Sequence, residues 1–373
     1  MKRSFVIVIL FSILMLTACD VRSTVVAPSP IPGNVYTQVY LSLDATTATK
    51  LNEIHVLTAK GHNGHVAKVK YVTSSNKILG VYSDGGYVIG WNIGTVDPVI
   101  KYALGIVSSK ALEFNKSGNL LMGATRHVFK PTTWKPNMSN QQETEYIDAI
   151  SLWNMETGSL IRCYGSACDA AQSDTTVGRI GAVMDSTGRR TLYYTEGSIS
   201  VSDGGIIFLN SPDSDYWWSI GGIAYDTTHD RYAVVFQEGK ISLSTGNSFF
   251  PYRTLLDGKE RDIREVTVAK FDQAGQKLGV IRGNSWFVLK VDEKEPYIKG
   301  DVQKPVALDF DQTGQLLAVA ADNKIVVWNL GNKSKVAEYD APEISSLAIS
   351  GDNRLLIWGD AKGKVHIWAA PSR

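Results

Sequence analysis

Two cysteines, Cys163 and Cys168, stand five positions apart in a polar stretch of the chain. Thiols this close in one loop can form a disulfide where the surroundings are oxidising, and the alternative is a pair of free thiols. They do not make a metal site on their own, because structural zinc needs about four ligands. No His-x-x-x-His or Cys-x-x-Cys motif supplies the missing ligands, so the sequence predicts no metal site.

Isolated carboxylates such as Glu143, Glu145 and Asp148 are the other candidates for chemistry. Glycoside hydrolysis uses two carboxyl groups at a defined separation, and the sequence alone leaves that separation open. The chain has no nucleophile elbow, no phosphate-binding loop and no dinucleotide fingerprint. We therefore expect no catalytic residue, no cofactor and no enzymatic activity.

The amino terminus has the pattern of an export signal. Residues 1–3 are Met-Lys-Arg, and the stretch Ser4–Ala18 that follows is almost wholly apolar. A membrane-spanning helix needs about 20 apolar residues, so this stretch is too short to be one. A charged start, a short apolar stretch and small residues before a cut are typical of a secretory signal.

The motif Leu16-Thr17-Ala18-Cys19 resembles the lipobox of bacterial lipoproteins. The resemblance implies cleavage before Cys19 and attachment of diacylglycerol to its sulfur, with acyl chains such as palmitate holding the protein at the membrane. Two acyl chains anchor a protein stably, whereas one does so only marginally. The implied location is the extracytoplasmic face of a bacterial cell membrane. The alternative is a secreted protein whose cysteine stands there by chance.

Three regions follow along the chain. Residues 1–18 are the expected lipoprotein signal peptide, and residues 19–34 are the lipidated cysteine and a proline-rich tether. Such a tether reaches about 20 Å as a flexible coil and about 45 Å when extended. Residues 35–373 are expected to fold. The formal net charge is only +1, without a basic cluster, so we expect no nucleic acid as partner.

A repeated landmark indicates how the folded region is built. Phe271–Ile281 reads FDQAGQKLGVI and Phe310–Ala320 reads FDQTGQLLAVA, 39 residues apart. Each segment is the end of one apolar strand, a polar turn and a second apolar strand. Weaker copies occur elsewhere, and a period of this size predicts an array of small β-units. The residues at the turn edge are Tyr71, Phe114, Met184, Tyr225, Phe271, Phe310 and Ile349.

A third strand is expected after each pair, and four of the seven end on Trp. These strands are predicted at Tyr87–Ile93, Ala149–Met155, Gly205–Asn210, Lys240–Ser244, Ser285–Val291, Lys324–Leu330 and Lys364–Trp368. The large apolar area and the indole N–H of Trp suit packing between neighbouring units.

This pattern resembles the WD-repeat β-propeller family over residues 53–369. Gly61-His62 followed by Trp91-Asn92 is the best local match, and Asp322 stands six residues before Trp328 as the blade aspartate of the family does. The resemblance implies an all-β, seven-bladed β-propeller. It also implies that His62, Trp91, Asp322 and Trp328 have structural roles within their blades.

The chain ends on the third strand of the last unit, which leaves that unit without a fourth strand. Residues 53–60, which read EIHVLTAK, alternate between apolar and polar and precede the first unit. We expect them to pair with the last blade, because ring closure protects strand edges that would otherwise aggregate.

Two insertions interrupt the repeats near the second unit, at Val128–Tyr146 and Arg162–Gly178. Loops longer than about 12–15 residues are often functional, and the alternative is decoration. In WD-type propellers both kinds of connection open on the same face, so both insertions are expected on one rim. Trp134 in the first insertion, and Trp217 and Trp218 between the third and fourth units, are candidate binding residues there.

The expected function is that of a membrane-anchored, non-enzymatic platform for a protein partner in the cell envelope. Two alternatives stay open. The first is a propeller that binds carbohydrate or a small ligand through Trp134 and Trp217 on its rim. The second is a propeller hydrolase with carboxylates at its central channel.

Overall fold

Strands make up nearly all of the regular structure. The computed structural model describes residues 40–84, 86–104, 106–128, 146–164, 181–185, 187–195, 198–201, 206–208, 220–245, 253–257 and 265–371 of the 373-residue chain. The helical elements within these ranges are two short 3₁₀ helices, η1 (Thr47–Lys50) and η2 (Thr73–Ser75). Neither is long or apolar enough to cross a membrane.

The strands of these ranges form seven four-stranded antiparallel sheets. The first two are β2 (Val66–Val72), β3 (Lys77–Tyr82), β4 (Tyr87–Asn92), β5 (Ile100–Ala103), and β6 (Ile106–Phe114), β7 (Leu120–Val128), β8 (Tyr146–Asn154), β9 (Leu160–Tyr164). The next two are β10 (Gly181–Met184), β11 (Thr191–Thr195), β12 (Ser198–Val201), β13 (Ile206–Phe208), and β14 (Ile220–Asp226), β15 (Arg231–Phe236), β16 (Ile241–Thr245), β17 (Arg253–Leu256). The fifth and sixth are β18 (Val266–Phe271), β19 (Lys277–Arg282), β20 (Ser285–Lys290), β21 (Pro296–Asp301), and β22 (Pro305–Phe310), β23 (Leu316–Ala321), β24 (Lys324–Asn329), β25 (Ser334–Asp340). The last is β26 (Ile344–Ile349), β27 (Leu355–Asp360), β28 (Lys364–Ala369) and β1 (Asn52–Thr58).

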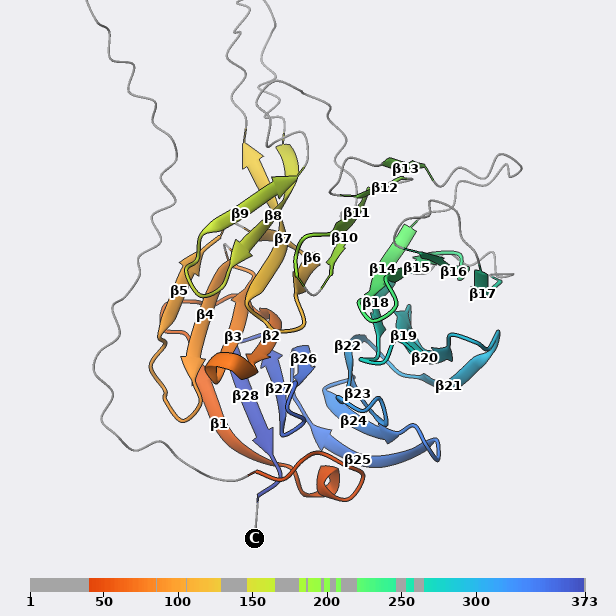
Figure 1. Cartoon of the computed structure of the whole chain (residues 1–373). Coiled ribbons are helices and arrows are strands. Elements are labelled where there is room, and N and C mark those ends of the chain that lie inside the picture. The colour runs from red at the N-terminus through yellow and green to blue at the C-terminus, as the bar shows by residue number, and fades with distance from the viewer. Residues whose placement is uncertain are drawn as a thin grey trace, which may run out of the picture.

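The sheets are arranged in a ring around a central axis (Figure 1). The first strand of each sheet contacts the first strand of the next, and β26 of the last sheet contacts β2 of the first, so the ring is closed. Each sheet is therefore one blade, numbered here from the blade of β2 to the blade of β26. The expected all-β propeller is confirmed.

The closing strand comes from the start of the described chain. β1 pairs antiparallel with β28, from Asn52 opposite Ala369 to Thr58 opposite Lys364. The expectation that residues 53–60 join the last blade is thus confirmed, with the strand beginning one residue earlier and ending at Thr58. A bridge between Tyr40 and Pro371 holds the chain that leads into β1 against the end of the last blade.

The repeated landmark is explained by the turn between the first and second strands of a blade. In the fifth blade, the Asp272 carboxylate accepts hydrogen bonds from the backbone N–H groups of Gln276 (2.7 Å) and Lys277 (3.0 Å). Gly275 has a φ of 68° and Gly314, in the next blade, a φ of 66°, a left-handed conformation that glycine adopts without steric cost. Asp followed by Gly three residues later is therefore the chemistry of this turn.

The same turns also contact the turns of adjacent blades. A Cβ atom placed on Gly314 would lie only 2.6 Å from Oδ2 of Asp272 in the preceding blade. One blade further round, the Asn353 side-chain amide lies 3.5 Å from Oδ2 of Asp311. Glycine or asparagine at this position thus meets the turn aspartate of the neighbouring blade.

One predicted strand is wrong. Gly205–Asn210 was expected to be the third strand of the third blade, but the structure has β13 there, which is the fourth strand. The third strand is β12, and Ser198 at its start pairs with Thr195 at the end of β11. Only two residues separate these strands, and the sequence of β12 is half serine, so it gives a weaker hydrophobic signal than β13.

Candidate functional site

Charged side chains occupy the same position on the first strand of four blades. Lys70, Glu113, Lys270 and Asp309 each stand one residue before a turn-edge residue, on β2, β6, β18 and β22. Val183, Ala224 and Ala348 hold this position in the other three blades.

Lys68 on β2 adds a third lysine to this level of the ring. Lys70, in the first blade, is affected by charges on Lys270 and Asp309, which belong to the fifth and sixth blades. The first strands surround the axis of the ring (Figure 1), so charges from blades that are not adjacent can act on one another there. We call Lys68, Lys70, Glu113, Lys270 and Asp309 the axial cluster.

Two ion pairs in the axial cluster join neighbouring blades. Nζ of Lys68 lies 2.8 Å from Oε2 of Glu113, and Nζ of Lys270 lies 2.6 Å from Oδ1 of Asp309. Oδ2 of Asp309 accepts a hydrogen bond of 3.0 Å from the backbone N–H of Ile349 on β26, in the next blade. The cluster is open to solvent, since the side chains of Lys68 and Lys270 keep 35% and 40% of their exposure.

The Glu113 carboxylate is poised to stay ionised. Burial raises the pKa of Glu113, but the ammonium groups of Lys68 and Lys270 outweigh it, so this pKa is lowered overall. Burial lowers the pKa of Lys270, but the Asp309 carboxylate outweighs it and raises that pKa. A general acid for glycoside hydrolysis needs a raised carboxyl pKa. The pKa of Glu113 is lowered instead, so these residues give the hydrolase alternative no support.

Lys70 differs from the other two lysines of the cluster. Among the described residues it makes no salt bridge, whereas Lys68 and Lys270 each contact a carboxylate. Burial, followed by the nearby charge of Lys270, lowers the pKa of Lys70 to about 8. Lys70 is therefore a partly buried cation without a direct anionic partner.

The resemblance to WD repeats predicted structural roles for His62 and Trp91 in the first blade, and for Asp322 and Trp328 in the sixth. His62 is buried, with Nδ1 3.4 Å from Oδ2 of Asp84 and its ring against Tyr87 at 4.3 Å between centroids. Trp91 is fully buried among side chains of the first and last blades. Both surroundings are those of packing residues.

Asp322 and Trp328 lie in the sixth blade. Asp322 is exposed in the turn between β23 and β24 with a φ of 51°, and its carboxylate makes no hydrogen bond within the part of the chain that the structure describes. The equivalent turn of the last blade carries Asp360, which is buried and accepts N–H hydrogen bonds from Lys362 and Lys364. Trp328 is partly buried and packs 5.3 Å from the Trp286 ring.

The candidate binding and lipidation residues lie outside the described residues. These are Cys19, Trp134, Cys168, Trp217 and Trp218. Cys163 is described, on β9, and it is disulfide-bonded. The pairing of Cys163 with Cys168 stays a prediction.

The first insertion begins and ends where the sequence placed it, whereas Arg162, the predicted start of the second insertion, lies within β9. The first lies between the end of β7 at Val128 and the start of β8 at Tyr146, which pair with each other. These two strands have nine residues each, whereas the second and third strands of the first blade have six. Three additional residue pairs at about 3.3 Å per residue carry this hairpin about 10 Å beyond the usual blade end.

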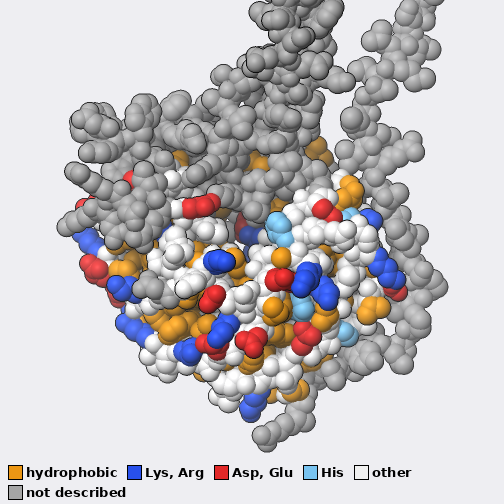
Figure 2. Space-filling view, turned by 180° about the vertical axis from the view of Figure 1, so that it is seen from behind, with side chains coloured by type: hydrophobic (Ala, Val, Ile, Leu, Met, Phe, Trp, Pro, Cys, Tyr) orange, Lys and Arg blue, Asp and Glu red, His pale blue; other side chains and the backbone are white. Residues whose placement is uncertain are grey.

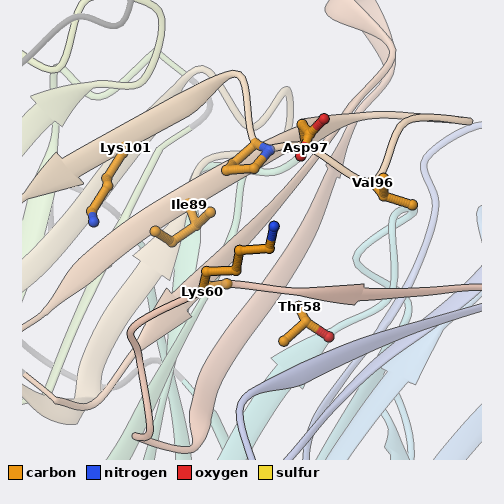
Figure 3. A pocket seen from close by; sticks show the side chains of 8 residues that line it. Thr58, Lys60, Ile89, Val96, Asp97 and Lys101 are labelled. Atoms are coloured by element: carbon orange, nitrogen blue, oxygen red, sulfur yellow. The ribbon is translucent and has the colours of Figure 1, made fainter.

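Two hollows on the described surface are smaller than a typical ligand pocket. One of them has about 110 Å³ and lies between the end of β1 and the connection of β4 to β5. Thr58, Ile89 and Val96 are among the residues that line it (Figure 3). Ligand pockets usually have about 300–1,000 Å³.

Charge on the described surface is mixed. On the face turned away in Figure 1, lysine and arginine alternate with aspartate and glutamate among uncharged side chains (Figure 2). A surface of this kind does not present the single-sign field that attracts a polyanion. No group of three or more His, Cys, Asp or Glu residues with a geometry for a metal ion occurs within the described ranges.

Sequence reasoning missed the axial cluster, although the signal was present. Lys70, Glu113, Lys270 and Asp309 each stand directly before the aromatic residue of the landmark. A charged residue at this place interrupts a mostly apolar strand. Aligning the seven landmarks and asking which neighbouring position carries charge would have found the cluster.

A comparison with protein families finds one match. Residues 297–329 match the model described as "WD domain, G-beta repeat". This segment runs from β21 of the fifth blade to the end of β24 in the sixth, so the sequence repeat is displaced by one strand from the structural blade. No curated protein matches the chain.

Among solved structures, the chain is similar to the β-propeller domain of Cps50 (Swd1) from Myceliophteria thermophila. The TM-score is 0.61 at 15% sequence identity, and the match covers 86% of this chain and 99% of that one. The likeness shows the fold alone, which is a β-propeller.

Proposed function

We propose that the protein is a lipid-anchored, non-enzymatic platform that presents a β-propeller on the extracytoplasmic face of a bacterial cell membrane and binds a protein partner there. WD-repeat propellers typically serve as protein-interaction scaffolds, and residues 297–329 match that repeat. The anchor rests on the lipobox at Leu16–Cys19 and the partner on the insertion at Val128–Tyr146.

The single observation that carries this proposal is that the described chain before β1 and the strand ends that flank the first insertion lie on opposite faces of the propeller. The chain that follows the tether lies against the turn between β26 and β27, where Leu43 and Asn353 exchange hydrogen bonds. The first insertion leaves from the connection of β7 to β8. In a four-stranded antiparallel blade, the first turn and the second connection are at opposite ends of the strands (Figure 1).

This arrangement suits a membrane-bound platform. A lipid on Cys19 would bring the face of the first turns toward the membrane, through a tether with a reach of about 20 Å as a coil. The projecting β7–β8 hairpin then points away from the membrane. A partner in the cell envelope can approach this face without displacing lipid.

We expect Cys19→Ala to release the protein from membranes and to abolish its labelling by a fatty acid, because the thiol is the attachment site. Fractionation of cells after feeding a labelled fatty acid measures both effects. Cys163→Ser serves as the matched control, since it removes a cysteine of the folded region and leaves Cys19 in place, and it should stay membrane-bound and labelled. Labelling that persists in Cys19→Ala would remove the anchor from the proposal.

We expect replacement of residues 129–145 by an Asn-Gly turn to abolish partner capture, because it removes the insertion and keeps the β7–β8 hairpin. Crosslinking on whole cells, followed by identification of captured proteins, measures the effect. A control variant shortens the connection of β4 to β5, residues 93–99, which lies on the opposite face. Equal capture by both variants and the unchanged protein would place recognition elsewhere.

A further inference from the structure

The charges of the axial cluster do not balance. Three lysines, Lys68, Lys70 and Lys270, face two carboxylates, Glu113 and Asp309. Each carboxylate already has a lysine as direct partner, at 2.8 Å and 2.6 Å. The excess positive charge is therefore located at Lys70.

The fold holds Lys70 in this position. Its stem runs along the turn between β6 and β7, where a Cβ atom on Gly118 would lie 3.3 Å from Cγ of Lys70. Gly118 has a φ of 79°, so the turn accepts glycine best and leaves room for the stem. The equivalent positions on the other strands are Val183, Ala224 and Ala348, whose apolar side chains offer no negative charge.

We propose that the axial cluster is a binding site for a small oxyanion, held by the ammonium group of Lys70 and stabilised by the positive charge of Lys68 and Lys270. An ammonium group has three N–H donors, and hydrogen bonds from a cation to an oxyanion are stronger than neutral ones. Surrounding protein lowers the effective dielectric constant and strengthens the attraction. This site is independent of the insertion and of the membrane anchor.

Anion binding at this site must be coupled to a proton. Four groups of the cluster act on Lys70: Lys270, Asp309, Glu113 and Lys68. With a pKa of about 8 in the unliganded protein, Lys70 is mostly charged below that pH and mostly neutral above it. A bound anion favours the charged form and raises the pKa of Lys70, so anion affinity falls as pH rises through about 8.

The test is protection of Lys70 from an amine-acylating reagent, measured by mass spectrometry on the full-length protein. Sulfate and acetate are the probes, at ionic strength held constant with chloride, because neither changes its protonation in the range used. We expect either probe to slow acylation of Lys70 and to leave the exposed Lys364 in the same digest unaffected. From about pH 7 to about pH 9, the affinity should fall about tenfold.

A variant of the cluster gives the second arm. Glu113→Gln removes one negative charge from the cluster at almost constant volume, so sulfate should protect Lys70 at a lower concentration than in the unchanged protein. Protection by both probes assigns a general oxyanion site, and protection by sulfate alone assigns a tetrahedral one. The inference would be overturned if neither sulfate nor acetate protects Lys70, or if Lys364 is protected to the same extent as Lys70.

Discussion

Removal of residues 364–373 is expected to unfold the whole propeller rather than one blade. This deletion takes away β28, which is the strand that joins β1 to β27. Val365, Ile367 and Trp368 are buried, and each large apolar side chain contributes about 1.5–3 kcal/mol when fully buried. The lost burial and pairing are comparable with the total stability of a domain, about 5–15 kcal/mol.

Contacts across the closing seam explain why the damage should spread. A Cβ atom on Gly359 of β27 would lie 2.4 Å from Cβ of Val66 on β2, so the last blade packs directly on the first. The Ser345 hydroxyl donates to the Val66 carbonyl at 2.9 Å, and the Tyr82 hydroxyl donates to the Gly363 carbonyl at 3.0 Å. Loss of the last blade therefore leaves the first one unsupported as well.

The seam also contains a polar contact that depends on closure. His366 of β28 lies with Nδ1 2.7 Å from Oε2 of Glu53 on β1 and with Nε2 3.3 Å from Oδ2 of Asp360. Its ring is stacked on Trp358 at 3.7 Å between centroids. The deletion removes this histidine and leaves the buried carboxylate of Asp360 without it.

Calorimetry and near-ultraviolet circular dichroism measure the result. The truncated protein should lose the cooperative transition and the aromatic signal of the buried Trp residues. A chain that lacks only residues 372–373 is the control, because it keeps β28 and should melt as the complete protein does. A truncated protein with an unchanged transition would contradict the role of β28 in holding the ring closed.

The sequence was a good guide to the scaffold because the fifth and sixth blades repeat the same turn chemistry. Asp272 and Gly275 reappear as Asp311 and Gly314, and their hydrogen bonds and positive φ values explain why these residue types recur. The sequence also predicted that β1 closes the ring, because the last unit had only three strands of its own. The exception was β12, where a short serine-rich strand gave less signal than the apolar β13 after it.

The axial cluster could not be derived from any one repeat. In a single repeat, successive side chains of a strand point to opposite faces of the sheet. This alternation does not indicate which of the two faces is turned toward the axis of the ring. Lys70 on β2 and Asp309 on β22 belong to different blades, and their charges act on each other only because the ring is closed. The spacing of Asp322 and Trp328 matched the WD pattern, yet in the structure the buried turn aspartate is Asp360.

Gly314→Ala is expected to destabilise the propeller by about 2–5 kcal/mol. A left-handed backbone costs an L-residue about 1–2 kcal/mol, and overpacking costs typically about 1–3 kcal/mol. Both apply here, since φ is 66° and the new Cβ would lie 2.6 Å from Oδ2 of Asp272. Asp272 cannot easily move, because its other oxygen accepts hydrogen bonds from Gln276 and Lys277 at 2.7 and 3.0 Å.

Gly61→Ala separates the cost of the left-handed backbone from the cost of overpacking. Gly61 has a φ of 83°, and no atom lies within 4 Å of the Cβ it would gain, so this control carries only the backbone cost. Denaturant unfolding of both variants gives the difference, which we expect to be about 1–3 kcal/mol in favour of Gly61→Ala. Equal destabilisation would mean that the contact between Gly314 and Asp272 does not couple adjacent blades. The coupling between these two blades would then rest on the apolar cluster between their sheets and on the ion pair of Lys270 with Asp309.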